Sequence, residues 1–234
     1  MNLIVKICGL STPETLDVAL ACGADMVGFV YFDKSPRHVG LERAAALAAR
    51  VEKRARKVLL TVDADDVSLA AAIAAFDPQA LQLHGHESPE RIASIRARFG
   101  LPVIKAIAIA GRADAEHALL FEAADYLLFD AKPAPGASRP GGNGSAFDWS
   151  VLSEIETRKP WLLAGGLDAQ NVADAIVRTC APGVDVSSGV ESAPGVKDPA
   201  RIAAFIAAVR RVGEGGTGSA PGPERRAWSL SRLL

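Results

Sequence analysis

The chain has 234 residues, of which 49% are hydrophobic, and its formal net charge is -1. This length suits one large core and is short for two α/β domains. The balanced charge favours neither nucleic acid nor an acidic membrane surface as a partner. The chain has no apolar run of about 18 residues and no basic N-terminal region followed by an apolar one, so we expect a soluble, cytoplasmic protein.

The stretch 3–9 predicts a strand, because it is apolar and rich in β-branched residues apart from Lys6. Side chains alternate between the two faces of a strand, so Lys6 and Cys8 point the same way, with the thiol at the C-terminal end. Ser11-Thr12-Pro13-Glu14 then supplies a hydroxyl cap and a first-turn proline for a helix. The chain therefore opens on a strand–helix unit.

The same pattern recurs along the chain. Further strands are expected at 25–30, 57–62, 80–83, 102–108, 126–129, 161–164 and 183–186. Helices are expected at 12–21, 41–52, 67–76, 89–99, 113–122, 148–157, 168–178 and 198–209. Eight strand–helix units predict an α/β fold, a single (β/α)₈ (TIM) barrel over residues 1–212.

A doubly wound open sheet is the alternative fold. It would place its glycine-rich turn after strand one, whereas the paired glycines of this chain follow strand seven. Residues 213–224 are mostly Gly, Ser, Pro and Thr, so we expect 213–234 to be a disordered tail.

Two candidate catalytic residues, Cys8 and Asp130, end predicted strands at the face where such barrels carry their chemistry. A free cysteine is more often a buried apolar filler, the interpretation that we apply to Cys22 and Cys180. For Cys8, the neighbouring Lys6 favours a thiolate. A lone aspartate is more often a cap, but no helix is expected directly after Asp130.

Glycine-rich turns follow predicted strands seven and eight, the loops that often bind phosphate in this fold. The candidate phosphate contacts are Gly165, Gly166, Ser188 and Gly189. A third glycine loop, with Gly142 and Gly144 as candidate substrate contacts, is either a mobile lid or a plain connection.

Other charged residues have two interpretations each. Asp185 on strand eight can pair with Lys6, since strands one and eight are neighbours in a closed barrel. The guanidinium of Arg37 suits a carboxylate but is equally typical of a solvated loop. The histidine pair 84 and 86 lacks an evident third metal ligand, and a Schiff base on Lys105 is the less favoured role for that lysine.

Taken together, these stretches resemble the phosphoribosylanthranilate isomerases of tryptophan biosynthesis. The matching segments, quoted in chain order, are KICG at 6–9, GFV at 28–30, SPR at 35–37, LQLHG at 81–85, FD at 129–130, GGNG at 141–144, FDW at 147–149, LAGGL at 163–167 and GVDVSSGVE at 183–191. One departure is Asn143, where the family has threonine.

The resemblance implies an Amadori rearrangement in which a phosphoribosylamine ring opens to a 1-deoxyribulose, with no metal or organic cofactor. It implies that Cys8 is the general base, Asp130 the general acid and Arg37 the contact for the anthranilate carboxylate. Lys6 and Asp185 are further candidate substrate contacts. The expected partner is a small phosphoribosyl substrate, and the chain is expected to be a monomer or a homodimer.

Two rival functions remain open from the sequence. One is another sugar-phosphate enzyme on the same barrel, such as a metal-dependent epimerase or a Schiff-base aldolase. The other is a phosphoribosyl-binding barrel without catalysis, which the presence of both Cys8 and Asp130 disfavours.

Overall fold

The computed structural model describes residues 3–132, 149–152, 157 and 159–215. Eight parallel strands form a closed barrel in sequence order, and β1 is hydrogen-bonded to both β2 and β8. The strands are β1 (Ile4–Cys8), β2 (Met26–Tyr31), β3 (Arg56–Thr61), β4 (Ala80–Leu83), β5 (Val103–Ile109), β6 (Tyr126–Ala131), β7 (Trp161–Leu163) and β8 (Gly183–Val186). The predicted (β/α)₈ barrel is confirmed.

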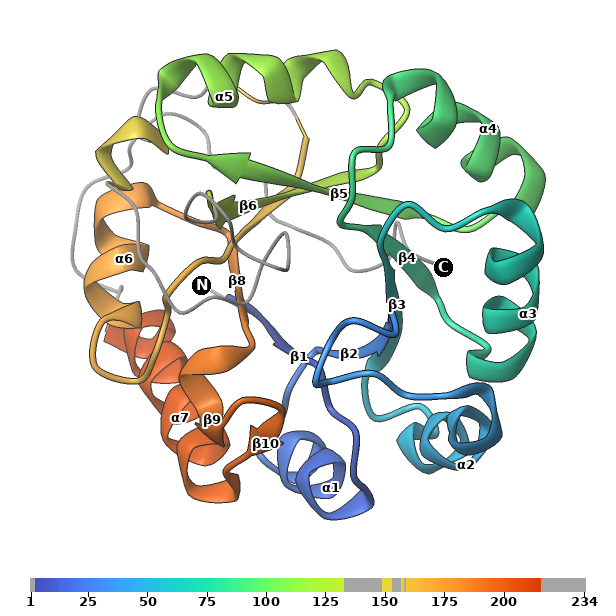
Figure 1. Ribbon diagram of the computed structural model, residues 1–234. Coiled ribbons are helices and arrows are strands. Elements are labelled where there is room, and N and C mark those ends of the chain that lie inside the picture. Colours follow the sequence, from blue (N-terminus) through green and yellow to red (C-terminus); the bar gives the residue numbers. More distant parts are fainter. Residues whose placement is uncertain (1–2, 133–148, 153–156, 158, 216–234) are drawn as a thin grey trace.

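Helices surround the barrel, as the view along its axis shows (Figure 1). They are α1 (Pro13–Ala21), α2 (Leu41–Val51), α3 (Asp66–Phe76), α4 (Pro89–Phe99), α5 (Arg112–His117), α6 (Val172–Thr179) and α7 (Pro199–Gly215). Three 3₁₀ turns are η1 (Ala118–Leu120), η2 (Trp149–Leu152) and η3 (Ser188–Val190). After η3, β9 (Glu191–Ala193) and β10 (Val196–Lys197) form a separate antiparallel hairpin that the sequence did not predict.

Four helices differ from the sequence-based prediction. The helix expected at 113–122 ends at His117 as α5 and is followed by the 3₁₀ turn η1. The helix expected at 148–157 falls largely outside the described residues, and 149–152 form a 3₁₀ turn. Helix α6 starts later than Asp168, because that carboxylate accepts the N–H groups of Gln170 and Asn171 in a preceding turn. Helix α7 runs to Gly215, past the predicted start of the tail, and residues 216–234 lie outside the described residues.

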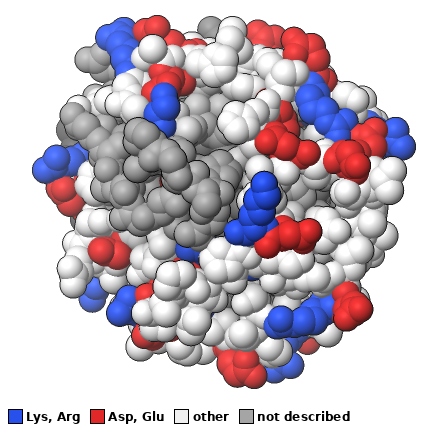
Figure 2. All heavy atoms as spheres, in the orientation of Figure 1, with Lys and Arg blue, Asp and Glu red and all other residues white. Residues whose placement is uncertain are grey.

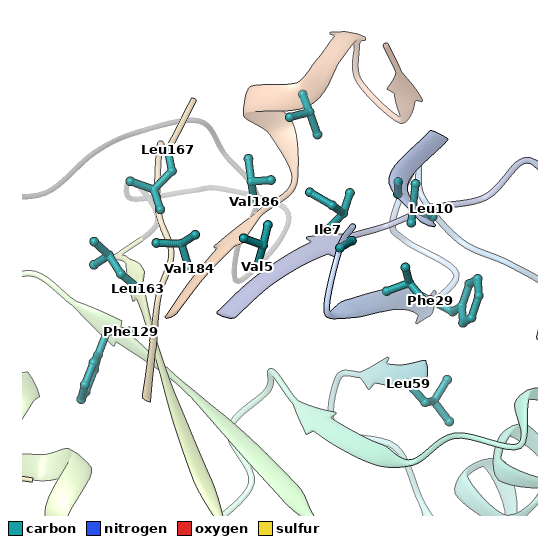
Figure 3. Close-up of a cluster of buried hydrophobic side chains, with 14 of the residues drawn as sticks. Val5, Ile7, Leu10, Phe29, Leu59, Phe129, Leu163, Leu167, Val184 and Val186 are labelled. Atoms are coloured by element: carbon teal, nitrogen blue, oxygen red, sulfur yellow. The ribbon is translucent and has the colours of Figure 1, made fainter. Parts of the chain in front are cut away.

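Alternation along the strands separates two layers of side chains. The odd-numbered residues of β1, Val5 and Ile7, lie in the large apolar layer between barrel and helices, together with Phe29 and Val184 (Figure 3). From β1 to β7 the even-numbered residues point into the barrel, and on β8 the odd-numbered Asp185 does so. The lower part of the barrel is filled by apolar side chains: Ile4, Met26, Val58, Ala80, Ile104, Ala106, Tyr126, Leu128, Leu162 and Ala164. Polar inward residues therefore occur above this floor, toward the C-terminal ends of the strands.

Charged side chains of both signs lie next to each other around the rim of the face seen in Figure 2. This distribution agrees with the formal net charge of -1. Among the described residues, no helix is both long and apolar enough to cross a membrane.

The Asp25 carboxylate joins three elements at the N-terminal end of the barrel. Its Oδ2 accepts the Val5 N–H of β1 at 2.8 Å and a guanidinium N–H of Arg210 in α7, also at 2.8 Å. Arg210 in addition donates to the carbonyls of Leu3 and Gly23. The last helix is thereby bound to the first two strands.

We predict that Asp25→Ala lowers the free energy of unfolding by about 1–3 kcal/mol, because a buried N–H and a guanidinium lose their acceptor. Urea denaturation followed by circular dichroism measures the change. Asp17→Ala is the control, since Asp17 pairs with Arg50 at the surface, and it should cost much less. Equal losses in the two variants would contradict this role of Asp25.

Candidate active site

Cys8 and Lys6 lie together on the inner face of β1, and both side chains are buried. Gly28 of β2 is the register partner of Cys8. A Cβ at position 28 would lie 3.0 Å from the Cys8 Sγ and 3.2 Å from the Lys6 Nζ. The missing side chain of Gly28 therefore makes the space in which thiol and ammonium sit side by side, a role that the sequence analysis did not identify.

Lys6 pairs with Asp185 across the seam between the first and last strands. The two residues are in register, and Lys6 Nζ donates to Asp185 Oδ1 at 2.8 Å. Burial lowers the pKa of Lys6, but the attraction of Asp185 and Cys8 outweighs it, so the Lys6 pKa lies above its usual value. The pairing considered from the sequence is confirmed, and Lys6 is a charged ammonium in the barrel.

The Cys8 thiol has a pKa above its usual value, because it is buried. The charge of Lys6 lowers this pKa, Asp185 raises it, and Lys197 of β10 lowers it again. The sequence-based expectation that Lys6 favours the thiolate is right in direction, but burial is the larger effect. At neutral pH the thiol form of Cys8 therefore predominates.

Arg37 lies in the loop after β2 and is bound to Glu191 of β9. Its Nε and Nη2 donate to the two Glu191 carboxylate oxygens at 2.6 Å and 2.8 Å. Lys197 Nζ donates to the same carboxylate at 2.7 Å and to the Ser187 carbonyl oxygen at 2.9 Å. Burial raises the pKa of Glu191, but the two cations outweigh it and bring the pKa below its usual range.

The hairpin that carries Glu191 and Lys197 is packed onto the loop of Arg37. Gly195 at its turn has a φ of +82°, and a Cβ there would lie 2.5 Å from the Pro36 carbonyl oxygen. This close approach requires glycine. The hairpin thus fixes Arg37 and brings a second lysine toward Cys8.

Asp130 is an inward residue of β6, and its side chain is largely buried. Its Oδ1 accepts the Ala131 N–H at 2.8 Å, and its Oδ2 lies 3.3 Å from the His84 Nε2. Gly165, with a φ of +85°, passes so close that a Cβ would lie 2.5 Å from the Ala131 nitrogen. The carboxyl group is held at the barrel mouth, and β7 and β8 separate its strand from β1 around the closed sheet.

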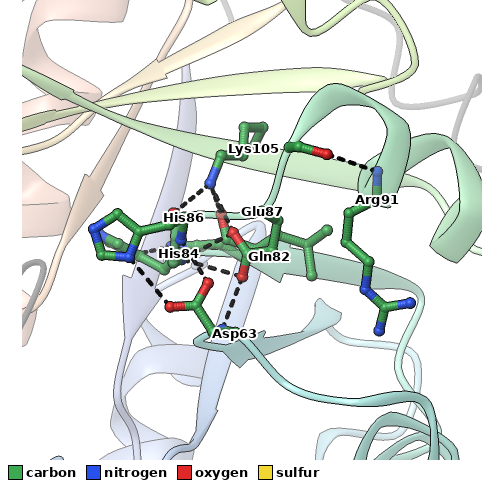
Figure 4. Close-up of polar contacts among 10 residues, drawn as sticks. Asp63, Gln82, His84, His86, Glu87, Arg91 and Lys105 are labelled. Carbon is green, nitrogen blue, oxygen red and sulfur yellow. Dashed lines mark hydrogen bonds and ion pairs between the residues drawn. The ribbon is translucent and has the colours of Figure 1, made fainter.

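The side chains of His84 and His86 contact different residues. His84 faces Asp130, whereas His86 is exposed and contacts Asp63, with 3.2 Å between Nδ1 and Oδ2. Within the described part of the chain, no three His, Cys, Asp or Glu side chains are grouped as a metal site. Lys105 lies outside the barrel interior, where its Nζ donates to Glu87 at 2.7 Å (Figure 4).

The predicted phosphate contacts lie in loops that touch each other. Gly165 and Gly166 have φ values of +85° and +64°. Ser188 and Gly189 begin η3, and a Cβ on Gly189 would lie 1.9 Å from the Leu167 carbonyl oxygen, so the loops after β7 and β8 are in direct contact. The candidates Gly142 and Gly144 lie outside the described residues.

The model of the N-(5'-phosphoribosyl)anthranilate isomerase family matches residues 5–208. The chain belongs to this family. A curated N-(5'-phosphoribosyl)anthranilate isomerase from Beijerinckia indica is 68% identical over 212 residues, which cover 90% of this chain and 96% of the relative. The family resemblance drawn from the sequence is confirmed, and the chain is an isomerase of the aldose–ketose type.

Solved structures agree with this assignment. Phosphoribosyl anthranilate isomerase from Thermotoga maritima is 34% identical with a TM-score of 0.81, and the match covers 90% of this chain and 100% of that one. A second structure of such an isomerase, in complex with reduced 1-(o-carboxyphenylamino)-1-deoxyribulose 5-phosphate, is 32% identical with a TM-score of 0.79 and the same coverage.

We predict that Lys197→Met raises the pKa of the Cys8 thiol further, because a positive charge that lowers this pKa is removed. The rate of alkylation by iodoacetamide as a function of pH, in a Cys22→Ser/Cys180→Ser background, measures it. Lys57→Met is the control, since Lys57 pairs with Asp77 at the other end of the barrel and should leave the Cys8 pKa unchanged. An unchanged or lower pKa in Lys197→Met would refute the effect.

Proposed function

We propose that this chain converts N-(5'-phosphoribosyl)anthranilate to 1-(2-carboxyphenylamino)-1-deoxyribulose 5-phosphate by an Amadori rearrangement, as a step of tryptophan biosynthesis. Family membership supports the substrate. The observation that carries the mechanism is a buried thiol on β1 and a buried carboxyl group on β6, both inward and at the same end of the barrel.

The reaction needs two proton transfers. Asp130 gives its proton to the ribose ring oxygen as the C1'–O bond breaks, which leaves an open imine with a cationic nitrogen. The Cys8 thiolate then removes the C2' proton, and the electron pair neutralises the nitrogen to give an enol-amine. Tautomerisation of the enol-amine gives the ketose, so the atoms and electrons of substrate and product balance.

Charges around Cys8 suit its role as a base. Burial disfavours the thiolate, and the two lysines 6 and 197 compensate in part, so the thiolate remains accessible without predominating. A desolvated thiolate is also a stronger base than one with a low pKa. The active form carries a thiolate on Cys8 and a proton on Asp130, which predicts a bell-shaped pH profile.

The remaining candidates bind the ends of the substrate. The Arg37 guanidinium, fixed by Glu191, is proposed to face the anthranilate carboxylate. The loops after β7 and β8 are proposed to bind the phosphate through Gly165, Gly166, Ser188 and Gly189, with Gly142 and Gly144 as further contacts. The ion pair of Lys6 and Asp185 is proposed to lie beneath the sugar, above the apolar floor.

We predict that Cys8→Ser lowers kcat by about a hundredfold or more, the usual scale for loss of an acid–base group, while KM changes little. The assay follows the loss of substrate fluorescence. Cys22→Ser, a change at the end of α1, should retain full turnover. Near-normal turnover in Cys8→Ser would remove this thiol from the mechanism.

Exchange of the C2' proton with solvent separates the two roles. On a ring-opened substrate analogue, exchange should disappear in Cys8→Ser, which lacks the base. It should persist in Asp130→Asn, because the opened analogue no longer needs the acid. Equal loss of exchange in both variants would contradict the assignment of base and acid.

We predict that Ser188→Asp raises KM by about tenfold or more, because it puts a negative charge where the phosphate should bind. Steady-state kinetics measure the effect. Ser94→Asp adds the same charge on the exposed side of α4 and is the control. If both variants had the wild-type KM, the phosphate would have to bind elsewhere.

A further inference from the structure

His84 lies between a buried amide and the proposed acid. It follows β4, whose inward residue Gln82 is fully buried. The His84 Nδ1 is 3.0 Å from the Gln82 Nε2, and the His84 Nε2 is 3.3 Å from the Asp130 Oδ2. The side chains of His84 and Asp130 are only 12% and 10% exposed, so this contact is shielded from water.

The amide determines which ring nitrogen carries the proton. In this orientation of the Gln82 amide, its Nε2 donates to Nδ1 of His84, which places the proton of a neutral ring on Nε2. That nitrogen faces Asp130 Oδ2 at 3.3 Å. The Gln82 Oε1 is buried without a hydrogen-bond partner among the described residues, so the contact with His84 is the one side-chain hydrogen bond recorded there for this amide.

Each oxygen of Asp130 faces one nitrogen. The Ala131 N–H donates to Oδ1, and the His84 Nε2 lies 3.3 Å from Oδ2. Each oxygen keeps one further lone-pair direction, so the carboxyl group can still carry a proton toward a substrate. When that proton leaves, both donors already face the new negative charge.

Other charged groups do not replace His84 in this contact. Among the described residues, the register partner of Asp130 on β5 is Ala108, and the inward Ala164 follows β7 on the other side. Lys105 of β5 is outside the barrel and binds Glu87, and Lys132 contacts Asp114 at 3.5 Å. The lysine of β1 is paired with Asp185 across the seam.

The loop that carries His84 is rigid. Glu87 accepts the N–H groups of Asp63 and Gly85 at 3.0 Å each and the Lys105 ammonium at 2.7 Å (Figure 4). A Cβ on Gly85 would lie 2.2 Å from an Asp63 carboxylate oxygen, so the backbone after His84 fits closely against the β3 loop. These contacts hold the backbone that carries the His84 imidazole.

We propose that His84 is a positioning residue of the isomerase reaction, which orients Asp130 and stabilises the carboxylate formed when Asp130 donates its proton, with Gln82 fixing the required tautomer. This inference rests on the proposed role of Asp130. It assigns to His84 a function distinct from that of its neighbour His86, which faces solvent and Asp63.

Three single variants test the proposal. His84→Leu removes the donor and should lower kcat by about tenfold to a hundredfold with little change in KM, because the acid is no longer held in place. His84→Gln keeps an N–H near the position of Nε2 and should restore most of the loss. His86→Leu, the matched control, should have wild-type kcat and KM.

A double-mutant cycle separates this proposal from the one on which it rests. In the Asp130→Asn background, His84→Leu should cause no further loss, because both changes remove the same function. An equal loss in both backgrounds, or wild-type kcat in His84→Leu beside an impaired Asp130→Asn, would overturn the role of His84. Near-normal turnover in Asp130→Asn would instead overturn the proposed acid.

Nitrogen-15 NMR of the imidazole rings tests the tautomer without using activity. His84 should show a protonated Nε2 and an unprotonated Nδ1 at neutral pH, and Gln82→Leu should mix the two tautomers. A proton on Nδ1 of His84 in the wild-type protein would overturn the proposed arrangement. Circular dichroism of each variant confirms that the barrel is folded.

Discussion

The buried ion pair of Lys6 and Asp185 is the interaction on which the site depends. It lies across the seam where β1 meets β8, so it joins the first and last strands inside the closed barrel. Both side chains are buried, and the attraction of Asp185 raises the pKa of Lys6 above its usual value, so Lys6 stays charged. The pair therefore fixes a positive charge beside Cys8, which a lone lysine in an apolar barrel would not provide.

Charges around Cys8 form two coupled groups. Lys6 with Asp185 is neutral overall, whereas Glu191 is shared by Arg37 and Lys197, which leaves one excess positive charge. Lys197 of this cluster lowers the pKa of the Cys8 thiol. The hairpin β9–β10 supplies two of the three charged groups in the second cluster, so a short element outside the barrel helps to determine the chemistry within it.

Side chains alternate between the two faces of a strand, and this rule explains why the inward residues of the site could be predicted from the sequence. Lys6, Cys8 and Asp185 could be assigned to the inner face because alternation is a local property of each strand. The hairpin β9–β10 was missed, since strands of two or three residues carry no detectable period. Contacts such as His84 with Asp130 and Glu191 with Arg37 depend on curvature and loop packing between distant elements, which no local pattern encodes. The sequence places Gly28 on the second strand, but it does not reveal that the side chains of Lys6 and Cys8 occupy the space beside this glycine.

The seam pair also bears on how this chain acquires its activity during synthesis. Lys6 and Asp185 are 179 positions apart, and Arg37 and Glu191 are 154 apart. Cys8 is translated long before Asp185 and Glu191, which belong to its electrostatic surroundings. A nascent chain that has emerged only as far as β7 carries the thiol without the carboxylate that keeps Lys6 charged. Contacts at such separation are slow to form, which makes closure of the barrel and onset of catalysis one late event.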